Sequence, residues 1–434
     1  MNLTEYLAAE WKPALGCTEP AAVALAACLA AGQGQGQDQG EPRMARLVVD
    51  ARTYKNCHAV GIPNSGRKTG VLWALALGAV LKDAKLGLQI FELVTPESLA
   101  KAARLLERGA VHVEVDASRT ELHIDCTVAS EGGVGRAVME REHTRLVRLE
   151  VDGVPVPLPA TQAGPAAKTG IREQVGALSL VELVSLAGTL TEADRARLRE
   201  GVALNLALAE HCIGLLPEGF VPGAEADPWL RIPRLVSAGV LGRMSGEAMT
   251  VMSLAGSGNK GITVAVAMSL WAQAQGAQGA QGGQRAGHSQ ARLEEALALA
   301  CLLTSATTHR LGTLSAICGA SNAAGIGIAA GLVHLGGGTP AQMDLAIHNM
   351  VGNLAGLICD GAKIGCAMKA MTGVEAAFRS ATLALAGFGI PETDGIVGHS
   401  GESSLANLGR LAQHGMVGVD TEILDIMQAK LGPA

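Results

Sequence analysis

Three cysteines in the last third of the chain carry the side chains best suited to metal chemistry. Cys359 and Cys366 lie in the Gly-punctuated stretch 356–366, and Cys318 lies in the earlier segment 316–321. Three thiolates are one ligand short of a closed four-cysteine zinc or iron–sulfur site, and an iron left open could act as a Lewis acid on a substrate. The gap between Cys359 and Cys366 is wider than a zinc knuckle prefers. It favours an iron–sulfur site, with ordinary buried cysteines as the open alternative.

A fourth cysteine, Cys17, precedes a predicted helix start at Thr18-Glu19-Pro20. Proline suits the first positions of a helix, and the positive end of the helix dipole is expected to lower the pKa of the Cys17 thiol. Cys17 is therefore a candidate general base, nucleophile or fourth metal ligand, and Glu19 a candidate substrate-binding residue. The alternative is an ordinary capped turn.

Two polar loops offer groups that could hold a substrate. One contains Ser257, Gly258 and Asn259, where glycine lets the backbone approach a ligand and amides at a helix start can bind a carboxylate or phosphate. The other, predicted as a loop over 54–68, contains Asn56 among many polar donors. Solvated turns are the alternative for both segments.

The composition limits the classes of protein to consider. The chain has 434 residues, 48% of them hydrophobic, which is enough for two domains and a large core. Aromatic residues make up 2% and the net charge is -6, so nothing indicates a nucleic-acid partner. The nine cysteines are odd in number and do not predict a disulfide framework. The Ala- and Leu-rich composition is compatible with a homodimer.

Neither a membrane span nor an export signal is predicted. The apolar stretch 311–347 carries one charge, Asp344, but glycines and Pro340 break it, whereas a span needs about 20 consecutive apolar residues. The first residues lack the basic and apolar regions of a secretory signal. We expect a cytoplasmic protein that does not bind membranes.

The hydrophobic pattern changes along the chain and predicts an α+β fold. We expect an N-terminal helical segment over 1–40 that packs on the catalytic domain, an inserted α+β domain over 41–160 and a large α-helical catalytic domain over 161–434. The Gln-Gly-Ala repeats of 273–292 and the Gly-Gln run of 32–37 predict flexible loops. Strands are expected at 46–51, 89–94, 111–115, 121–125 and 146–151, with a helix at 69–81.

Taken together, these segments resemble the L-cysteine desulfidase family, within the serine dehydratase alpha-chain-like group. The matching motifs run from the first helix to near the C-terminus: Gly16-Cys17-Thr18-Glu19-Pro20, Lys55-Asn56, Gly61-Ile62-Pro63, Gly256-Ser257-Gly258-Asn259, Cys318, Ile358-Cys359-Asp360-Gly361-Ala362-Lys363 and Gly365-Cys366. The resemblance implies a [4Fe-4S] cluster held by Cys318, Cys359 and Cys366, with Cys17 near the open iron.

The activity that the resemblance implies is β-elimination of L-cysteine to pyruvate, ammonia and sulfide. Departures from the family pattern at Asn64-Ser65-Gly66-Arg67, at Lys260 and at His399-Ser400 bear on substrate preference. L-serine dehydration at the same cluster is one alternative. A second is a pyridoxal phosphate lyase in which Lys260 forms the Schiff base, and a third is a non-catalytic membrane or regulatory protein.

Overall fold

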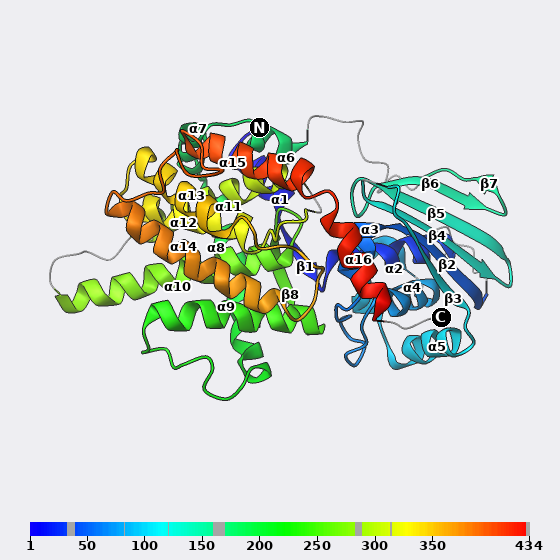
Figure 1. Cartoon of the computed structure of the whole chain (residues 1–434). Coiled ribbons are helices and arrows are strands. Elements are labelled where there is room, and N and C mark those ends of the chain that lie inside the picture. Colours follow the sequence, from blue (N-terminus) through cyan, green and yellow to red (C-terminus); the bar gives the residue numbers. More distant parts are fainter. Residues whose placement is uncertain are drawn as a thin grey trace.

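The computed structural model describes residues 1–32, 40–81, 83–119, 121–158, 170–282, 289–312 and 315–430. Helices and a mixed sheet make up the fold, so the predicted α+β class is confirmed. Figure 1 shows a larger part made mostly of helices beside a smaller part in which helices lie against a sheet. Buried hydrophobic residues form two clusters, one centred in each part.

A six-stranded sheet in the order β3-β2-β4-β5-β6-β7 forms one layer of the smaller part. Only β2 and β3 pair in parallel, and the other neighbours are antiparallel. The strands predicted near 46–51, 111–115 and 146–151 are present, and the one at 121–125 overlaps β4; β5 was not predicted. The strands are β2 (Pro42–Asp50), β3 (Val111–Asp116), β4 (His123–Ser130), β5 (Gly133–Glu140), β6 (Leu146–Val151) and β7 (Val154–Pro155).

The strand predicted at 89–94 is wrong, because these residues lie in a 3₁₀ segment kinked at Gly87. Its β-like pattern reflects burial of Ile90 and Phe91 in the core of the smaller part. The predicted helix at 69–81 is confirmed as α4. The helices of this part are α2 (Thr18–Ala30), α3 (Ala51–Cys57), α4 (Val71–Val80), η1 (Ala84–Leu93) and α5 (Pro96–Glu107).

Helix α2 is buried along its whole length between the sheet and α4. Small residues make this possible: a Cβ added at Gly135 in β5 would lie 1.7 Å from the Ala30 carbonyl oxygen, and one at Gly78 in α4 would lie 2.3 Å from that of Ala24. The expectation that residues 1–40 pack together on the helical part therefore needs correction. The first two elements join the core of the helical part, but α2 is central to the other core.

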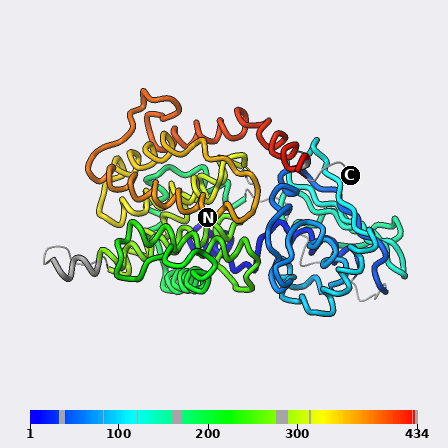
Figure 2. The backbone as a smooth tube through the Cα atoms, turned by 60° about the horizontal axis from the view of Figure 1, so that its bottom comes forward, coloured from blue at the N-terminus to red at the C-terminus, as the bar shows by residue number. Residues whose placement is uncertain are grey.

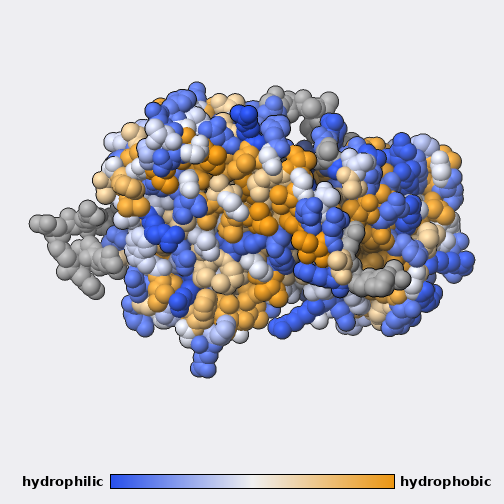
Figure 3. All heavy atoms as spheres, in the orientation of Figure 1, coloured by the Kyte–Doolittle hydropathy of each residue, from blue (hydrophilic) through white to orange (hydrophobic). Residues whose placement is uncertain are grey.

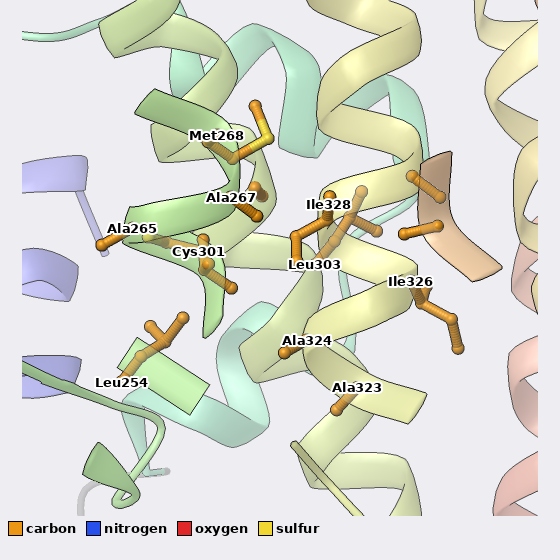
Figure 4. Close-up of a cluster of buried hydrophobic side chains, with 14 of the residues drawn as sticks. Leu254, Ala265, Ala267, Met268, Cys301, Leu303, Ala323, Ala324, Ile326 and Ile328 are labelled. Carbon is orange, nitrogen blue, oxygen red and sulfur yellow. The ribbon is translucent and has the colours of Figure 1, made fainter. Parts of the chain in front are cut away.

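The larger part packs its helices closely around small side chains. Figure 4 shows side chains from α10, α11 and α12, among them Ala267, Cys301 and Ile328, meeting in this core. A Cβ at Gly327 would lie 2.4 Å from the Ala300 carbonyl oxygen, so α11 and α12 approach backbone to backbone. The elements are α1 (Leu3–Glu10), β1 (Trp11–Leu15), α6 (Ile171–Gly176), α7 (Leu180–Ala187), α8 (Glu192–His211), η2 (Cys212–Leu215), α9 (Pro228–Ser245), β8 (Thr250–Leu254), α10 (Gly258–Gly282), α11 (Gln290–Leu311), α12 (Asn322–Leu335), α13 (Pro340–Leu354), α14 (Cys366–Leu385), α15 (Gly401–Arg410), η3 (Leu411–Gly415) and α16 (Val419–Ala429).

Both chain ends connect the two parts. Near the N-terminus, β1 pairs antiparallel with β8 of the helical part and leads directly toward α2. At the other end, α16 leaves the helical part and packs against α3, as Figures 1 and 2 show for the red C-terminal helix beside the blue segment. The site described below lies where these connections meet.

Part of the loop predicted at 273–292 is helical, because α10 extends to Gly282 and α11 begins at Gln290. Alanine and glutamine between the glycines are good helix formers, which the repeat pattern obscured. Residues 33–39 of the other predicted loop lie outside the described residues. The domain boundaries at 41–160 and 161–434 stay a prediction.

The surface in Figure 3 mixes hydrophilic and hydrophobic residues, and the hydrophobic ones gather over the middle of the face shown. Ile364, just before α14, and Met368, within it, are among the exposed hydrophobic side chains. Within the described residues, no helix has the length and hydropathy that a membrane span requires.

Candidate active site

The segments that carry Cys318 and Cys359 are joined by backbone hydrogen bonds. The Cys318 amide donates to the Leu357 carbonyl oxygen at 2.9 Å, and the Cys359 amide donates to that of Ala316 at 2.7 Å. Cys366 is the first residue of α14, and its Sγ lies 3.5 Å from the Gly361 carbonyl oxygen. Residues up to 48 positions apart in the sequence are thus held in one region.

The three thiols are close enough to affect one another's ionisation. Burial raises the pKa of Cys366 to about 12, and the Cys318 charge adds to this rise. Burial also raises the pKa of Cys359, while Lys55 and Lys369 oppose the rise. Without a cation, Cys359 and Cys366 are therefore neutral thiols, and a metal centre would have to displace their protons.

Three thiols are a donor set that can hold the irons of an iron–sulfur cluster. Among the described residues, no group of three or more His, Cys, Asp or Glu side chains is close enough to hold a metal ion. Each thiolate of a cluster binds its own iron, so cluster ligands surround a volume instead of converging on one point. Two lysines lie beside this segment, each also paired with a carboxylate. Lys55 donates to the Cys359 carbonyl oxygen at 2.7 Å and pairs with Asp420, and Lys369 donates to that of Ile358 at 2.9 Å and pairs with Asp360.

Cys17 caps the N-terminus of α2, as predicted, but its side chain does not bond to the helix amides. Its Sγ donates to Glu19 Oε2 at 3.0 Å, and the Thr18 hydroxyl donates to the same oxygen at 2.9 Å. The predicted lowering of the Cys17 pKa is wrong. Burial raises the pKa of this thiol and the Glu19 charge raises it further, both of which outweigh the helix dipole.

Glu19 is the acceptor at the centre of this group. Burial opposes its ionisation, but the charge of His143 and the hydrogen bonds from Cys17 and Thr18 lower its pKa overall. The Asn56 side-chain amide donates to the other carboxylate oxygen, Oε1, at 3.1 Å. Cys17 and Glu19 are therefore a thiol–carboxylate pair whose proton lies on sulfur.

Helix α3 links this pair to the three cysteines. Residues 54–57 of the predicted loop are helical, because the Asp50 side chain caps α3 by accepting from the amides of Arg52 and Thr53. Two consecutive side chains of α3 then contact different segments: Asn56 donates to Glu19, and Lys55 donates to the Cys359 carbonyl oxygen. The Cys17 turn and the Cys359 segment are therefore tied to the same helical turn.

The buried Lys55 ammonium is also paired with Asp420 of α16, a contact that was not predicted. Asp420 accepts from Arg52 as well, at 2.8 Å. The side chains of Lys55 and Asp420 are 2% and 8% exposed, so the C-terminal helix contributes a buried charge beside the Cys359 segment. No local motif marks such a pair, since 365 residues separate its members.

The predicted Gly-rich segment forms a tight turn that leads into α10. Ala255 and Gly256 adopt positive φ angles of 49° and 74°, and the amides of Leu254 and Ser257 exchange hydrogen bonds across the turn. Gly258 begins the helix, so its first amides have no partner within α10. The Asn259 side chain accepts from Arg243 at 3.0 Å, which makes it a partner of a buried cation that the sequence did not reveal.

Two further groups near the site were not predicted as functional. His143, from the turn between β5 and β6, is half-buried with its Nε2 enclosed and unpartnered, and desolvation lowers its pKa against the opposing charge of Glu19. Arg172 of α6 forms a bidentate ion pair with Glu10, at 2.9 to 3.2 Å. Both residues come from segments without a recognisable motif.

Lys260, considered above as a Schiff-base lysine, is 7% exposed. Its Nζ donates to the Ala255 carbonyl oxygen at 3.2 Å and to the Thr308 hydroxyl at 3.0 Å, and burial lowers its pKa to about 7. A Cβ added at Gly319 would lie 2.8 Å from Lys260 Cε. The side chain therefore packs against the segment that carries Cys318.

Comparison with known proteins gives the class of this site. The family profile described as serine dehydratase alpha chain matches residues 85–425. A UPF0597 protein of Desulfotalea psychrophila is 37% identical over 96% of both chains. UPF0597 proteins of Geobacter sulfurreducens and Caldanaerobacter subterraneus are 34% and 32% identical, each over at least 98% of both chains. The chain belongs to the serine dehydratase alpha chain family, whose members are iron–sulfur-dependent lyases.

Proposed function

We propose that this protein is an iron–sulfur lyase that eliminates the β-substituent of L-cysteine, giving pyruvate, ammonia and hydrogen sulfide. The observation that carries the proposal is the link through α3: Lys55 bonds to the Cys359 carbonyl and Asn56 bonds to Glu19. The helical turn that holds the proton acceptor Glu19 therefore also holds the segment that carries Cys359. Family membership supports the lyase class and the cofactor.

Cys318, Cys359 and Cys366 would hold a [4Fe-4S] cluster, which supplies an open iron that stabilises the leaving sulfide. Cys318 and Cys366 are buried, and Cys359 is half-buried. Burial raises the pKa of Cys359, but the charges of Lys55 and Lys369 lower it, which suits an anionic centre. Three protein ligands leave one iron free for the substrate. Cys17 is the cysteine that the family motif places near this open iron.

Cys17 would remove the proton from the substrate α-carbon after passing its own proton along the hydrogen bond to Glu19 Oε2. In the substrate-free site the Glu19 charge raises the Cys17 pKa and keeps this proton on sulfur, so the transfer is an uphill step of the proposed mechanism. Asn56 donates to the other Glu19 oxygen and keeps the carboxylate in this orientation. The C–S bond then breaks, and the enamine product takes up water to give pyruvate and ammonia.

Substrate binding is assigned to Ser257, Gly258 and the first amides of α10, with Glu19 and Asn56 as groups for the substrate amine. The first amides of a helix have no partner within the helix and can bind a carboxylate. Binding the substrate through these groups would orient its α-carbon before the chemical step, which lowers the entropy cost of the reaction. We further propose a cytoplasmic enzyme that acts on a small amino acid and functions as a homodimer.

L-serine dehydration at the same site is a second candidate, which the family description favours. Both reactions need the same base and carboxylate site, and they differ only in the leaving group. A thiolate is the softer ligand and suits iron better than hydroxide, so we place L-cysteine first.

The test is anaerobic reconstitution with iron and sulfide, followed by sulfide and pyruvate assays on L-cysteine and L-serine. Cys359→Ala is expected to abolish both the visible absorbance of the cluster and turnover. Cys17→Ala should keep the cluster and lose about 10²- to 10⁴-fold in kcat, the usual contribution of a general base. Cys126→Ala, a buried cysteine of β4, is the matched control and should change neither. Turnover of both amino acids by Cys359→Ala would refute the proposal.

A further inference from the structure

Arg243, in the last turn of α9, is a buried cation without a carboxylate partner. The residue is 3% exposed, and no acidic side chain lies within ion-pair distance of it in the described part of the chain. Among the described residues, the Arg243 guanidinium makes one hydrogen bond, from Nη1 to Asn259 Oδ1. Burying a guanidinium without a counter-charge costs folding free energy. We therefore expect an anion to pair with Arg243 when the substrate is bound.

The free edge of the guanidinium has a specific geometry. Nε is fully buried and has no partner, and Nη2 makes no hydrogen bond among the described residues. These two N–H groups form the side of the guanidinium that binds a carboxylate with two parallel hydrogen bonds. Arg172 shows the occupied version in the same molecule, since its Nε and Nη2 both donate to Glu10.

The same edge adjoins the N-terminus of α10. A Cβ added at Gly258 would lie 2.2 Å from Arg243 Nε, so only a glycine at this position lets the guanidinium pack directly against the start of α10. Gly258 is also the first residue of α10, whose amides and dipole favour negative charge. Two independent features, a cation and a helix start, therefore lie side by side.

Cys17 lies within the electrostatic reach of this cation, because the Arg243 charge opposes the rise of the Cys17 pKa. The turn carrying Cys17 and the end of α9 both pack on the segment 61–63: a Cβ at Gly16 would lie 2.5 Å from Pro63 Cγ, and one at Gly61 would lie 2.3 Å from the Ser245 carbonyl carbon. An anion held by Arg243 would thus lie on the same side of the site as the proton acceptor.

We propose that Arg243 and the first amides of α10 bind the α-carboxylate of the amino-acid substrate. This inference rests on the proposed function and deepens it, because it assigns carboxylate recognition to a residue outside every motif of the sequence. Asn259, predicted to contact the substrate, instead holds Arg243 in place through Nη1 and leaves the other edge free.

Binding of a non-reactive ligand tests the inference independently of turnover. L-alanine has the carboxylate and amine of the substrate but no leaving group, and L-alaninamide replaces the carboxylate by a neutral amide. By calorimetry on the reconstituted protein, the wild type should bind L-alanine about 100-fold more tightly than L-alaninamide, the scale of a buried charge pair. Arg243→Gln should bring this ratio close to one.

Two further variants complete the design. Arg243→Lys keeps the positive charge but lacks the two parallel N–H groups of a guanidinium, and should retain an affinity ratio of about 10. This variant tests the inference if Arg243→Gln does not fold. Arg234→Gln, on the same helix, removes a guanidinium that bonds to the Phe220 carbonyl and should leave the ratio unchanged. A wild-type ratio retained in Arg243→Gln or in Arg243→Lys, or no preference in the wild type, would overturn the inference. Arg243→Gln could lose the binding ratio while the wild type releases neither sulfide nor pyruvate from L-cysteine. That result would support the carboxylate site and refute only the proposed function.

Discussion

Replacing Asp420 by asparagine tests whether the C-terminal helix is held by a buried charge beside the site. Asparagine keeps the shape and one acceptor oxygen but removes the charge that Lys55 and Arg52 share. Breaking a buried ion pair on one side costs about 3–5 kcal/mol. The lower end applies here, because Lys55 keeps its bond to the Cys359 carbonyl and Arg52 is 33% exposed.

A loss of about 3 kcal/mol corresponds to a roughly 100-fold larger opening constant for α16. Hydrogen exchange of the α16 amides measures this directly and does not require the whole chain to unfold in one step. Asp425→Asn, an exposed position on the same helix, is the control and should exchange like the wild type. Exchange in Asp420→Asn within about threefold of that control would refute the reasoning. The double variant Lys55→Met with Asp420→Leu should recover most of the protection, because no buried charge is then left unpaired.

Three other changes have defined outcomes. Glu19→Gln removes a charge that raises the Cys17 pKa, so peptide mapping should show several-fold faster alkylation of Cys17 at pH 8; an unchanged rate would contradict the thiol–carboxylate pair. His143 has a lowered pKa in the folded protein, so the unfolded chain binds a proton there first, near pH 6.5, and stability should fall as the pH drops from about 7 through that value. The urea midpoint of His143→Gln should fall less over the same range, and a pH profile parallel to that of the wild type would contradict the assignment. Gly258→Ala places a methyl group against Arg243 Nε, so the guanidinium must move and L-alanine binding should weaken at least about tenfold by calorimetry; equal affinity would contradict a role for Arg243 at this position.

The sequence predicted the local features of the site better than its long-range contacts. Cys17 at the start of α2 and the Gly-rich turn before α10 followed from helix-start chemistry, which is encoded within a few residues. The direction of the Cys17 pKa could not be predicted, because it depends on burial and on Glu19 pointing back at the thiol. The position of Lys55 in a helix was missed, since its cap at Asp50 looked like the end of a strand.

The contacts of the buried charges were beyond the sequence. Asp420 lies 365 residues from Lys55, and Arg243 lies in a helix whose pattern is that of a packed core. Neither position differs in type or spacing from surface residues, and only the packing of α16 on α3 and of α9 on the α10 turn makes them buried. The fold class was accessible because the change from alternating to helical hydrophobic patterns extends over whole elements.

Mössbauer spectra of protein reconstituted anaerobically with ⁵⁷Fe test the central proposal most directly, because they distinguish the irons of a cluster by their ligands. The proposal predicts a [4Fe-4S] signal in which one iron differs from the other three and shifts when L-cysteine is added, and which is absent from Cys359→Ala. A protein that binds no cluster under these conditions, or a cluster whose irons all ignore L-cysteine, would contradict it.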